Sequence, residues 1–599
     1  MTIETLPAMP VTVERDVAAT MRDGTVLRAD VYRPVDAAAA GSGGDVPVLL
    51  CRSPYDKRVN ISTFGNAHPA WYASHGYMVV IQDTRGRYAS EGDFYPFAHE
   101  MDDGYDTVEW AATLPGSNGD VGMFGFSYVG ATQLLAAVTR PPSLRAIAPG
   151  FTASQYYDGW TYNGGALAAA FVCYWANLLA LGSAVRAEDR AAADALSASL
   201  GGAEGWFWWL PMSEFPPLQS GYAPYFYDWV EHCTYDDYWK RWSIDADYSR
   251  IEVPALHFGG WWDVFLDGTV KNFTGLQASA GTEAARGAQK LLVGPWTHMP
   301  WTPVSRCGGD GPSTNEIDDW QLRWFDHTLK GIDTGVLDHP VTVFTLDGGW
   351  RDLDGWPPSD AAAEDWYIHS RGRANSKFGD GTLDRVPPTA EPPDLFVYDP
   401  GVPIPSMGGH SCCFDTITPM GPADQHQAEV SRMILVYTSE PLVADIELLG
   451  DVSVTLHAAT TAADTDFTAR LCVVDPDGRS VNLQEGILRA RYRHSLSDPE
   501  PLVPGEVYEL RIELGPVGAR IAAGSRLRLD ISSSDFPQWD RNLNTGGTPL
   551  AESALVAAPA TQTVLHDTDH PTRITLPVRL PGTSSLVRQA HEPDNMVEL

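Results

Sequence analysis

The sequence predicts an α/β domain that is interrupted by a helical segment and followed by an all-β domain. Strands and helices alternate over the first 150 residues, strands disappear between 151 and 245, and period-two strands dominate after about 350. A chain of 599 residues is long enough for about four ordinary domains. We expect 1–150 and 246–350 to form the two parts of the α/β domain, 151–245 a helical insertion, and 351–599 a β-sandwich or jelly roll.

The charge balance excludes several classes of partner. The chain has 77 acidic against 41 basic residues, a formal net charge of −36. Such a surface repels phosphate backbones and anionic lipids, and no cluster of Lys and Arg compensates for it. We therefore expect neither a nucleic-acid nor a membrane partner. The partner that we expect is a small-molecule substrate, and the charge balance does not decide whether the chain forms a homo-oligomer.

The cysteines and the N-terminus predict a cytoplasmic protein. The seven cysteines are scattered, none forms a CxxC pair, and the adjacent Cys412 and Cys413 do not make a zinc ligand set. This usage indicates a reducing compartment. The N-terminus lacks a basic region followed by an apolar run, so we expect no signal peptide. The apolar stretch 166–185 has nearly the length of a membrane span but is rich in Ala, and we interpret it as a buried helix.

The elements of the α/β domain follow one another in a regular order. The first part has strands at 26–34, 46–55 and 77–84, a helix at 102–114, and a strand, turn and helix beginning at 121. After the insertion, with its Ala-rich and aromatic stretches, come a strand at 253–263, a helix at 267–278, a strand at 290–296 and a helix at 318–331. This alternation predicts a parallel sheet.

Ser127 lies on the turn between the strand and the helix that begin at 121. The sequence Gly125-Phe126-Ser127-Tyr128-Val129-Gly130 has a glycine two positions before the serine, as in a nucleophile elbow. The second glycine stands at 130 instead of 129, so the usual G-x-S-x-G pattern is not met. By itself this pattern also fits a serine that caps a helix packed on the sheet.

A nucleophilic serine needs a base, and the base needs an acid that orients it. Asp263 follows the strand at 253–263, and His298 follows the next strand, so the order Ser, Asp, His is that of an α/β-hydrolase. The 35-residue separation of Asp263 and His298 fits one crossover between parallel strands. We therefore predict Ser127, Asp263 and His298 as a catalytic triad.

Six motifs in order give the chain a family resemblance. They are CRSPYDK (51–57), DTRGRYASEG (83–92), GFSYVG (125–130), GGWWDVF (259–265), GPWTH (294–298) and SSSDFPQWDRNLNTG (532–546). Together they resemble the cocaine esterase-like family, which is related to the X-Pro dipeptidyl-peptidases and the α-amino-ester hydrolases. The resemblance implies an α/β-hydrolase domain with an inserted helical cap and a C-terminal jelly roll.

The same resemblance implies roles for further residues. It places Tyr55 of the Pro-Tyr-Asp motif and the backbone amide of Tyr128 in the oxyanion hole, and Phe265 in the acyl pocket. In the amino-ester hydrolases, acidic residues two and three positions after the triad Asp help to hold the α-ammonium group of the substrate. Phe265 and Leu266 stand there in this chain. Asp83 and Arg85 could touch substrate, but we favour a buried ion pair that braces their loop.

The predicted function is a serine hydrolase that cleaves carboxylic esters, or activated amides, with an apolar or aryl acyl group through an acyl-enzyme. The aromatic residues Trp160, Trp175 and Trp262 are predicted to line the pocket with Phe265. The sequence has no P-loop and no zinc-protease motif, and no dinucleotide fingerprint lies between a predicted strand and helix. No metal or organic cofactor is therefore implied.

Three alternatives stay open. A β-lactam side-chain acylase would carry the same motifs. An X-Pro dipeptidyl-peptidase is disfavoured, because those enzymes carry a large extra N-terminal domain and here the nucleophile arrives by residue 127. The third is a catalytically degenerate binding protein that uses the jelly roll, against which the complete triad argues.

Overall fold

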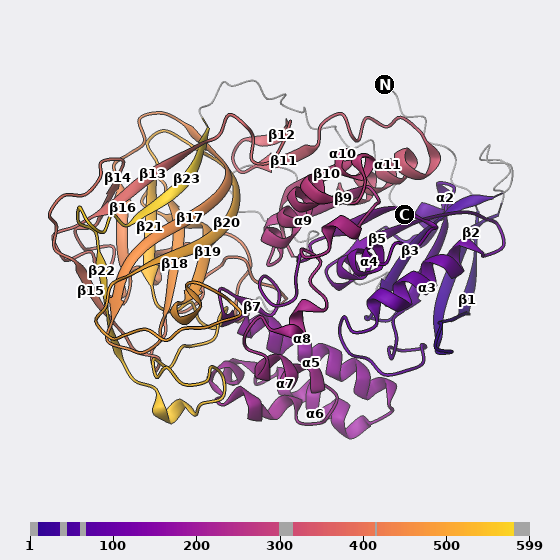
Figure 1. Cartoon of the computed structure of the whole chain (residues 1–599), viewed down its shortest axis with the longest axis horizontal. Helices are drawn as coiled ribbons and strands as arrows, with labels where there is room; N and C mark the ends of the chain where they lie inside the picture. The colour runs from indigo at the N-terminus through magenta and orange to yellow at the C-terminus, as the bar shows by residue number, and fades with distance from the viewer. Residues whose placement is uncertain (1–9, 36–44, 60–66, 299–315, 414–415, 580–599) are drawn as a thin grey trace.

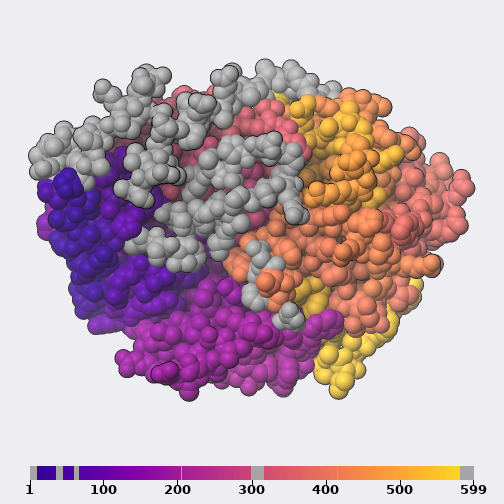
Figure 2. All heavy atoms as spheres, turned by 180° about the vertical axis from the view of Figure 1, so that it is seen from behind, coloured from indigo at the N-terminus to yellow at the C-terminus, as the bar shows by residue number. Residues whose placement is uncertain are grey.

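The chain folds into three parts that pack side by side (Figure 1). The computed structural model describes residues 10–35, 45–59, 67–298, 316–413 and 416–579. In Figure 2 the helical cap, in purple, lies along the edge where the α/β domain, in indigo, and the β-sandwich, in orange and yellow, come together. The α/β-hydrolase fold with a cap and a C-terminal β domain agrees with the fold class predicted from the sequence.

The α/β domain is built on one mixed sheet whose strand order is β1-β2-β4-β3-β5-β6-β9-β10-β11-β12. The run from β4 to β11 is parallel, whereas β1, β2 and β12 join it in antiparallel pairs. The strands span Val11–Thr20 (β1), Val26–Pro34 (β2), Val46–Ser53 (β3), Met78–Asp83 (β4), Ser117–Phe126 (β5), Leu144–Gly150 (β6), Ala255–Trp262 (β9), Gln289–Thr297 (β10), Val341–Thr345 (β11) and Gly349–Leu353 (β12).

Helices cover both faces of this sheet. Along β3, Val48 and Leu50 face one apolar cluster while Leu49 and Cys51 face another, as the period of two requires. The first cluster includes residues of α3 (Glu100–Ala112) and α4 (Tyr128–Val138), and the second includes residues of α2 (Pro69–Ser74) and α11 (Ile317–Lys330). Two further helices, between β9 and β10, are α9 (Leu266–Ser279) and α10 (Glu283–Gly287). The central parallel strands are buried on both sides, which explains their near-continuous apolar sequence.

The cap consists of α5 (Ala169–Arg186), α6 (Arg190–Leu200), α7 (Pro224–Glu231), α8 (Asp237–Lys240) and short 3₁₀ turns. By length and composition α5 could cross a membrane, but 61% of its apolar window is buried inside the protein. It is therefore a core helix, as the sequence indicates. The prediction that strands are absent from 151–245 is wrong in one detail, because Tyr162–Asn163 (β7) pairs with Ala166–Leu167 (β8).

The C-terminal domain encloses a second apolar core between its strands. These strands span Ala362–His369 (β13), Thr382–Asp384 (β14), Asp394–Tyr398 (β15), Leu435–Ser439 (β16), Ile446–Thr460 (β17), Asp466–Val474 (β18), Ser480–Arg489 (β19), Tyr508–Ile521 (β20), Arg526–Ser532 (β21), Ala560–Leu565 (β22) and Arg573–Arg579 (β23). Neighbouring strands are antiparallel except for β14 and β16.

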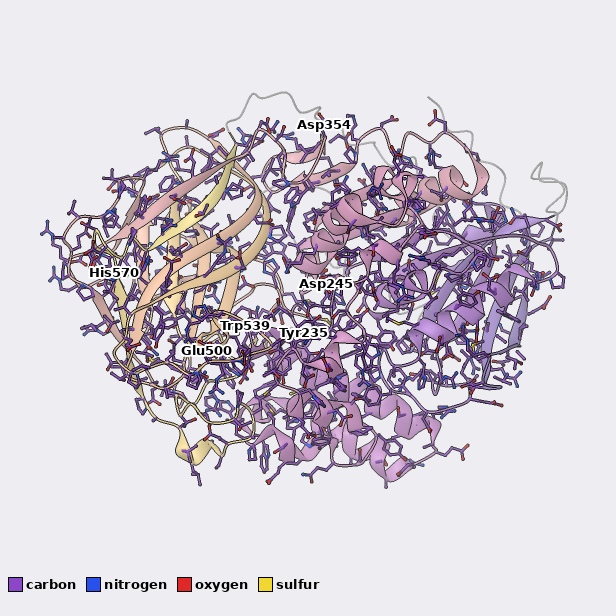
Figure 3. The ribbon with its side chains drawn as sticks, in the orientation of Figure 1. Tyr235, Asp245, Asp354, Glu500, Trp539 and His570 are labelled. Atoms are coloured by element: carbon purple, nitrogen blue, oxygen red, sulfur yellow. A yellow bond between two sulfur atoms is a disulfide. The ribbon has the colours of Figure 1, made fainter. Side chains whose placement is uncertain are left out.

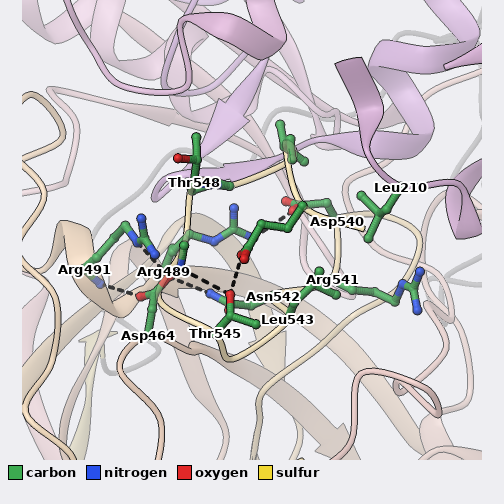
Figure 4. Close-up of a pocket in the computed structure, with 14 residues that line it drawn as sticks. Leu210, Asp464, Arg489, Arg491, Asp540, Arg541, Asn542, Leu543, Thr545 and Thr548 are labelled. Carbon is green, nitrogen blue, oxygen red and sulfur yellow. Dashed lines mark hydrogen bonds and ion pairs between the residues drawn. The ribbon is translucent and has the colours of Figure 1, made fainter. Parts of the chain in front are cut away.

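Buried polar contacts join the cap to the sandwich, and Tyr235 and Trp539 mark this junction in Figure 3. Asp540 accepts hydrogen bonds from the Leu167 amide at 2.6 Å and from Arg489 at 2.9 Å. The indole of Trp539 donates to Asn163 Oδ1 at 2.9 Å. The last sequence motif, 532–546, therefore holds two domains together. A small pocket at the junction is lined by such pairs (Figure 4) and contains none of the predicted triad residues.

One expectation about the cysteines needs correction. Cys412 and Cys413 are joined by a disulfide in the structure, whereas their sequence context indicated a reduced set. The free cysteines among the described residues are Cys51, Cys173, Cys233 and Cys472, all of them buried. Cys307 lies outside the described residues.

Candidate active site

Ser127 sits at the tight turn between β5 and α4. Its φ of 61° is in the left-handed region, which is strained for a residue with a side chain. Gly125 is required because a Cβ there would lie 2.3 Å from Val129 Cγ1, and at Gly130 a Cβ would lie 2.7 Å from the carbonyl oxygen of Gly150. The shifted second glycine thus allows α4 to approach the end of β6, which explains the G-x-S-x-x-G spacing.

The three predicted triad residues lie together at the carboxyl edge of the sheet. β9 ends just before Asp263, and the adjacent parallel strand β10 ends just before His298. His298 Nδ1 lies 2.7 Å from Asp263 Oδ1, and His298 Nε2 lies 3.0 Å from Ser127 Oγ. A carboxylate only accepts hydrogen bonds, so Nδ1 carries the proton and Nε2 presents its lone pair to the serine. All three side chains are buried.

Two hydrogen-bond donors flank Ser127. Its own amide donates to the Gly150 carbonyl at 2.9 Å, which leaves the amide of Tyr128, at the start of α4, as the next backbone donor. The Tyr128 phenol belongs to the core, since it donates to Glu100 Oε1 at 2.9 Å. The second donor is the hydroxyl of Tyr55, which accepts a hydrogen bond from Trp175 Nε1 at 2.9 Å.

The Tyr55 hydroxyl keeps its proton over the whole physiological range. Burial raises the pKa of Tyr55 to about 12, although the hydrogen bonds with Trp175 and Ser127 oppose the rise. The hydroxyl accepts from the indole and is also hydrogen-bonded with Ser127, which places it beside the predicted nucleophile. A neutral phenol with this orientation can donate to a developing negative charge.

Ion pairs brace the loop that carries Tyr55. The Lys57 amide and ammonium groups donate to Asp83 at 2.7 and 3.0 Å, and both side chains are fully buried. Arg85 pairs instead with Asp103, at 2.6 Å. The expected ion pair between Asp83 and Arg85 is therefore wrong, because Asp83 pairs with Lys57 and Arg85 with acidic residues of other segments, although both pairs still brace the loop.

Arg87, in the same motif, was not identified from the sequence. It is buried, and its guanidinium donates to the Pro54 carbonyl at 2.7 Å and to the Leu179 carbonyl and Ser183 hydroxyl of α5, each at 2.9 Å. It therefore connects the residue before Tyr55 with the cap helix that carries Trp175.

Three of the four predicted pocket residues form one aromatic group, which contacts His298 through Phe265. Phe265 stacks on Trp160 with ring centroids 4.2 Å apart and meets His298 edge-on at 5.1 Å. Trp160 in turn contacts Trp175 at 5.3 Å. Trp262 does not join this group. As the last residue of β9 it packs in the sandwich-side cluster, with its ring 5.7 Å from that of His410.

His410 fastens the sandwich to the strand that leads to Asp263. Its Nδ1 lies 2.9 Å from Glu485 Oε1, and its Nε2 donates to the Trp261 carbonyl at 2.7 Å. Burial alone would lower the pKa of His410, but the Glu485 carboxylate raises it above the ordinary value. Nothing in the sequence marks this residue, because its partners belong to two other segments.

Comparison with known proteins agrees with this architecture. The profile of the X-Pro dipeptidyl-peptidase (S15 family) matches residues 23–300, and that of the X-Pro dipeptidyl-peptidase C-terminal non-catalytic domain matches 334–575. An aminopeptidase from a marine-sediment thaumarchaeon aligns with a TM-score of 0.76 and 23% identity, covering 96% of this chain and 98% of that one. An α-amino acid ester hydrolase gives 0.75 and 23%, covering 97% and 98%. At this identity the two structures establish the fold class.

The fold and the sequence profiles define the chain as a serine-type hydrolase of the S15 class. A cocaine esterase from a Rhodococcus species is 35% identical over 581 residues, which are 94% of this chain and 98% of that protein. The chain therefore belongs to the cocaine esterase family and is an enzyme of ester hydrolysis.

Proposed function

We propose that the protein hydrolyses carboxylic esters with an apolar or aryl acyl group through a covalent acyl-enzyme formed on Ser127. The observation that carries this proposal is the hydrogen-bonded chain from Asp263 through His298 to Ser127, at 2.7 and 3.0 Å. A serine hydroxyl is inert near neutral pH, and this chain supplies the base that it needs.

Each step uses a group in its observed position. His298 Nε2 takes the proton of Ser127 Oγ as the oxygen attacks the ester carbonyl, and Asp263 stabilises the imidazolium that forms. The former carbonyl oxygen becomes an oxyanion, toward which the Tyr128 amide and the Tyr55 hydroxyl donate. His298 then gives its proton to the departing alcohol, and a water molecule repeats the sequence to release the acid.

The stacked rings of Trp160 and Phe265 support the choice of acyl group. Both are buried, and Phe265 touches the edge of the His298 ring. An aryl or branched alkyl group gains from such neighbours, because transfer of apolar surface from water contributes about 25 cal/mol per Å². Leu266 is also buried and apolar, so neither residue provides a counter-ion for an α-ammonium group.

Labelling with a fluorophosphonate probe and turnover of a panel of esters test the proposal. The parent protein is expected to react with the probe and to release phenol from phenyl esters, and Ser127→Ala to do neither. Dipeptide amides and β-lactams in the same panel separate the ester hydrolase from the two alternative hydrolases. Probe labelling that persists in Ser127→Ala would refute the assignment of the nucleophile.

A further inference from the structure

Two adjacent cysteines lie beside His298. Cys412 and Cys413 belong to the long loop between β15 and β16 of the sandwich. Their sulfur atoms and a ring nitrogen of His298 all lie within 4.8 Å of one another. Cys412 is fully buried and packs in the same apolar cluster as Phe265. The loop thus brings a pair of sulfur atoms to the proposed general base.

The position of this pair is fixed by contacts on its N-terminal side. His410, two residues before Cys412, is held between Glu485 of β19 and the Trp261 carbonyl of β9. The His410 amide also donates to Glu485, at 2.6 Å. Ser411 Oγ donates to Thr418 Oγ1 at 2.8 Å within the same loop. The cysteines are therefore delivered to the end of β9, where Asp263 orients His298.

Thiolate sulfur and imidazole nitrogen are the preferred ligands of zinc and of softer cations. Metal–ligand bonds of about 2.0–2.3 Å in tetrahedral geometry place such donors about 3–4 Å apart. The two sulfur atoms, which the disulfide joins, must therefore separate after reduction, whereas the His298 nitrogen already lies within 4.8 Å of both. Asp263 holds Nδ1 of His298 at 2.7 Å, so Nε2 is the nitrogen that can bind an ion. A carboxylate on the other ring nitrogen is also the usual support of a metal-binding histidine.

We propose that Cys412 and Cys413, once reduced, form with Nε2 of His298 an inhibitory site for one thiophilic cation such as Zn²⁺ or Cd²⁺. Reduction by a phosphine with water gives two thiols and a phosphine oxide. Each thiol then loses one proton as its sulfur binds the ion, with no further change of oxidation state. The ion takes the lone pair that would accept the Ser127 proton, so catalysis stops. The disulfide has no thiolate to offer and protects the histidine.

Direct binding is measured first, because it does not depend on activity. Phosphine-reduced protein is titrated with Cd²⁺ while the ultraviolet thiolate-to-cadmium absorption and the heat of binding are recorded. One ion per chain is expected for the parent and for the control variant Cys233→Ser, which removes a thiol of the cap and leaves Cys412 and Cys413 in place. Cys412→Ser and Cys413→Ser should lose the absorption, and His298→Gln should bind about tenfold or more weakly.

Inhibition is measured second, and this arm rests on the proposed function. Hydrolysis of a phenyl ester by reduced protein should fall in proportion to Cd²⁺ bound and return with a chelator, each variant being compared with its own uninhibited rate. The oxidised parent should keep its activity, which tests the site even where a cysteine variant fails to fold. Equal inhibition of oxidised and reduced protein, or equal Cd²⁺ affinity in His298→Gln, would overturn the proposal. An inactive parent would refute the proposed function alone, since the binding data would still decide the site.

Discussion

Replacing Tyr55 with phenylalanine isolates one donor of the proposed oxyanion hole. The hydroxyl accepts from Trp175 Nε1 at 2.9 Å and is also hydrogen-bonded with Ser127, so it stands where an oxyanion next to Ser127 would form. Loss of one such donor costs about 3–4 kcal/mol of transition-state stabilisation, or roughly 10²–10³ in kcat. KM should change little, because the uncharged ester carbonyl uses this donor weakly.

The same substitution has a second, independent effect on stability. The indole of Trp175 is 4% exposed, and in Tyr55→Phe its N–H loses its acceptor. A buried donor without a partner costs about 1–3 kcal/mol, which should appear in the free energy of unfolding from urea titration. Trp175→Phe is the matched control, because it removes the donor and keeps the hydroxyl. It should lower kcat less than Tyr55→Phe does.

Steady-state kinetics with a phenyl ester decide between the catalytic and the structural reading of Tyr55. A Tyr55→Phe enzyme that keeps near-parental kcat, or that changes only in KM, would refute the oxyanion hole proposed here. A fall in kcat that Trp175→Phe reproduces in full would assign the effect to the orientation of the phenol.

Four further outcomes are expected. Ser127→Ala should lower kcat by a factor on the order of 10⁴–10⁶ and abolish probe labelling, with an unchanged far-ultraviolet circular dichroism spectrum. Phenylglycine methyl ester should give a lower kcat/KM than phenylacetic acid methyl ester, because Phe265 and Leu266 supply no counter-ion; a strong preference for the amine would contradict this. Since the pKa of Tyr55 is raised to about 12, its neutral form persists, and the kcat ratio of parent to Tyr55→Phe should stay constant up to a pH of about 11. Arg87→Met should lower kcat more than it raises KM, and an unchanged kcat would show that Arg87 only stabilises the fold.

The proposed triad could be predicted from the sequence because each member lies at a strand end. A parallel sheet brings the carboxyl ends of its strands to one edge. The order and spacing of Ser127, Asp263 and His298 were therefore sufficient to predict that they lie close together. Strands β2, β3, β4, β5, β9 and β10 were also predictable, because apolar runs bounded by turn residues indicate them locally. The sequence analysis did not predict β1, β6, β11, β12 or α2. The strand pair β7 and β8 was missed because two-residue strands have no measurable period.

The other parts of the site depend on contacts between segments far apart in the sequence, which no local pattern predicts. Trp262 and Phe265 stand three positions apart, but the chain turns between them, so only Phe265 reaches the group around Trp160. Adjacent cysteines are visible in the sequence, yet their place beside His298 is set by the anchoring of His410 across two domains. The spacing of residues along the chain cannot predict these contacts, because the segments meet only where the sandwich packs against the α/β domain.

The position of Tyr55, the proposed oxyanion donor, depends on the cap as much as on the α/β domain. Helix α5 supplies Trp175 to the Tyr55 hydroxyl, and the same helix receives the Arg87 guanidinium that also holds the Pro54 carbonyl. A shift of α5 would therefore move both the hydroxyl and the loop that carries it. In an enzyme whose cap only covers the substrate, changes along this helix would alter KM. Here they reach a group that we propose acts in the transition state, and so they should alter kcat.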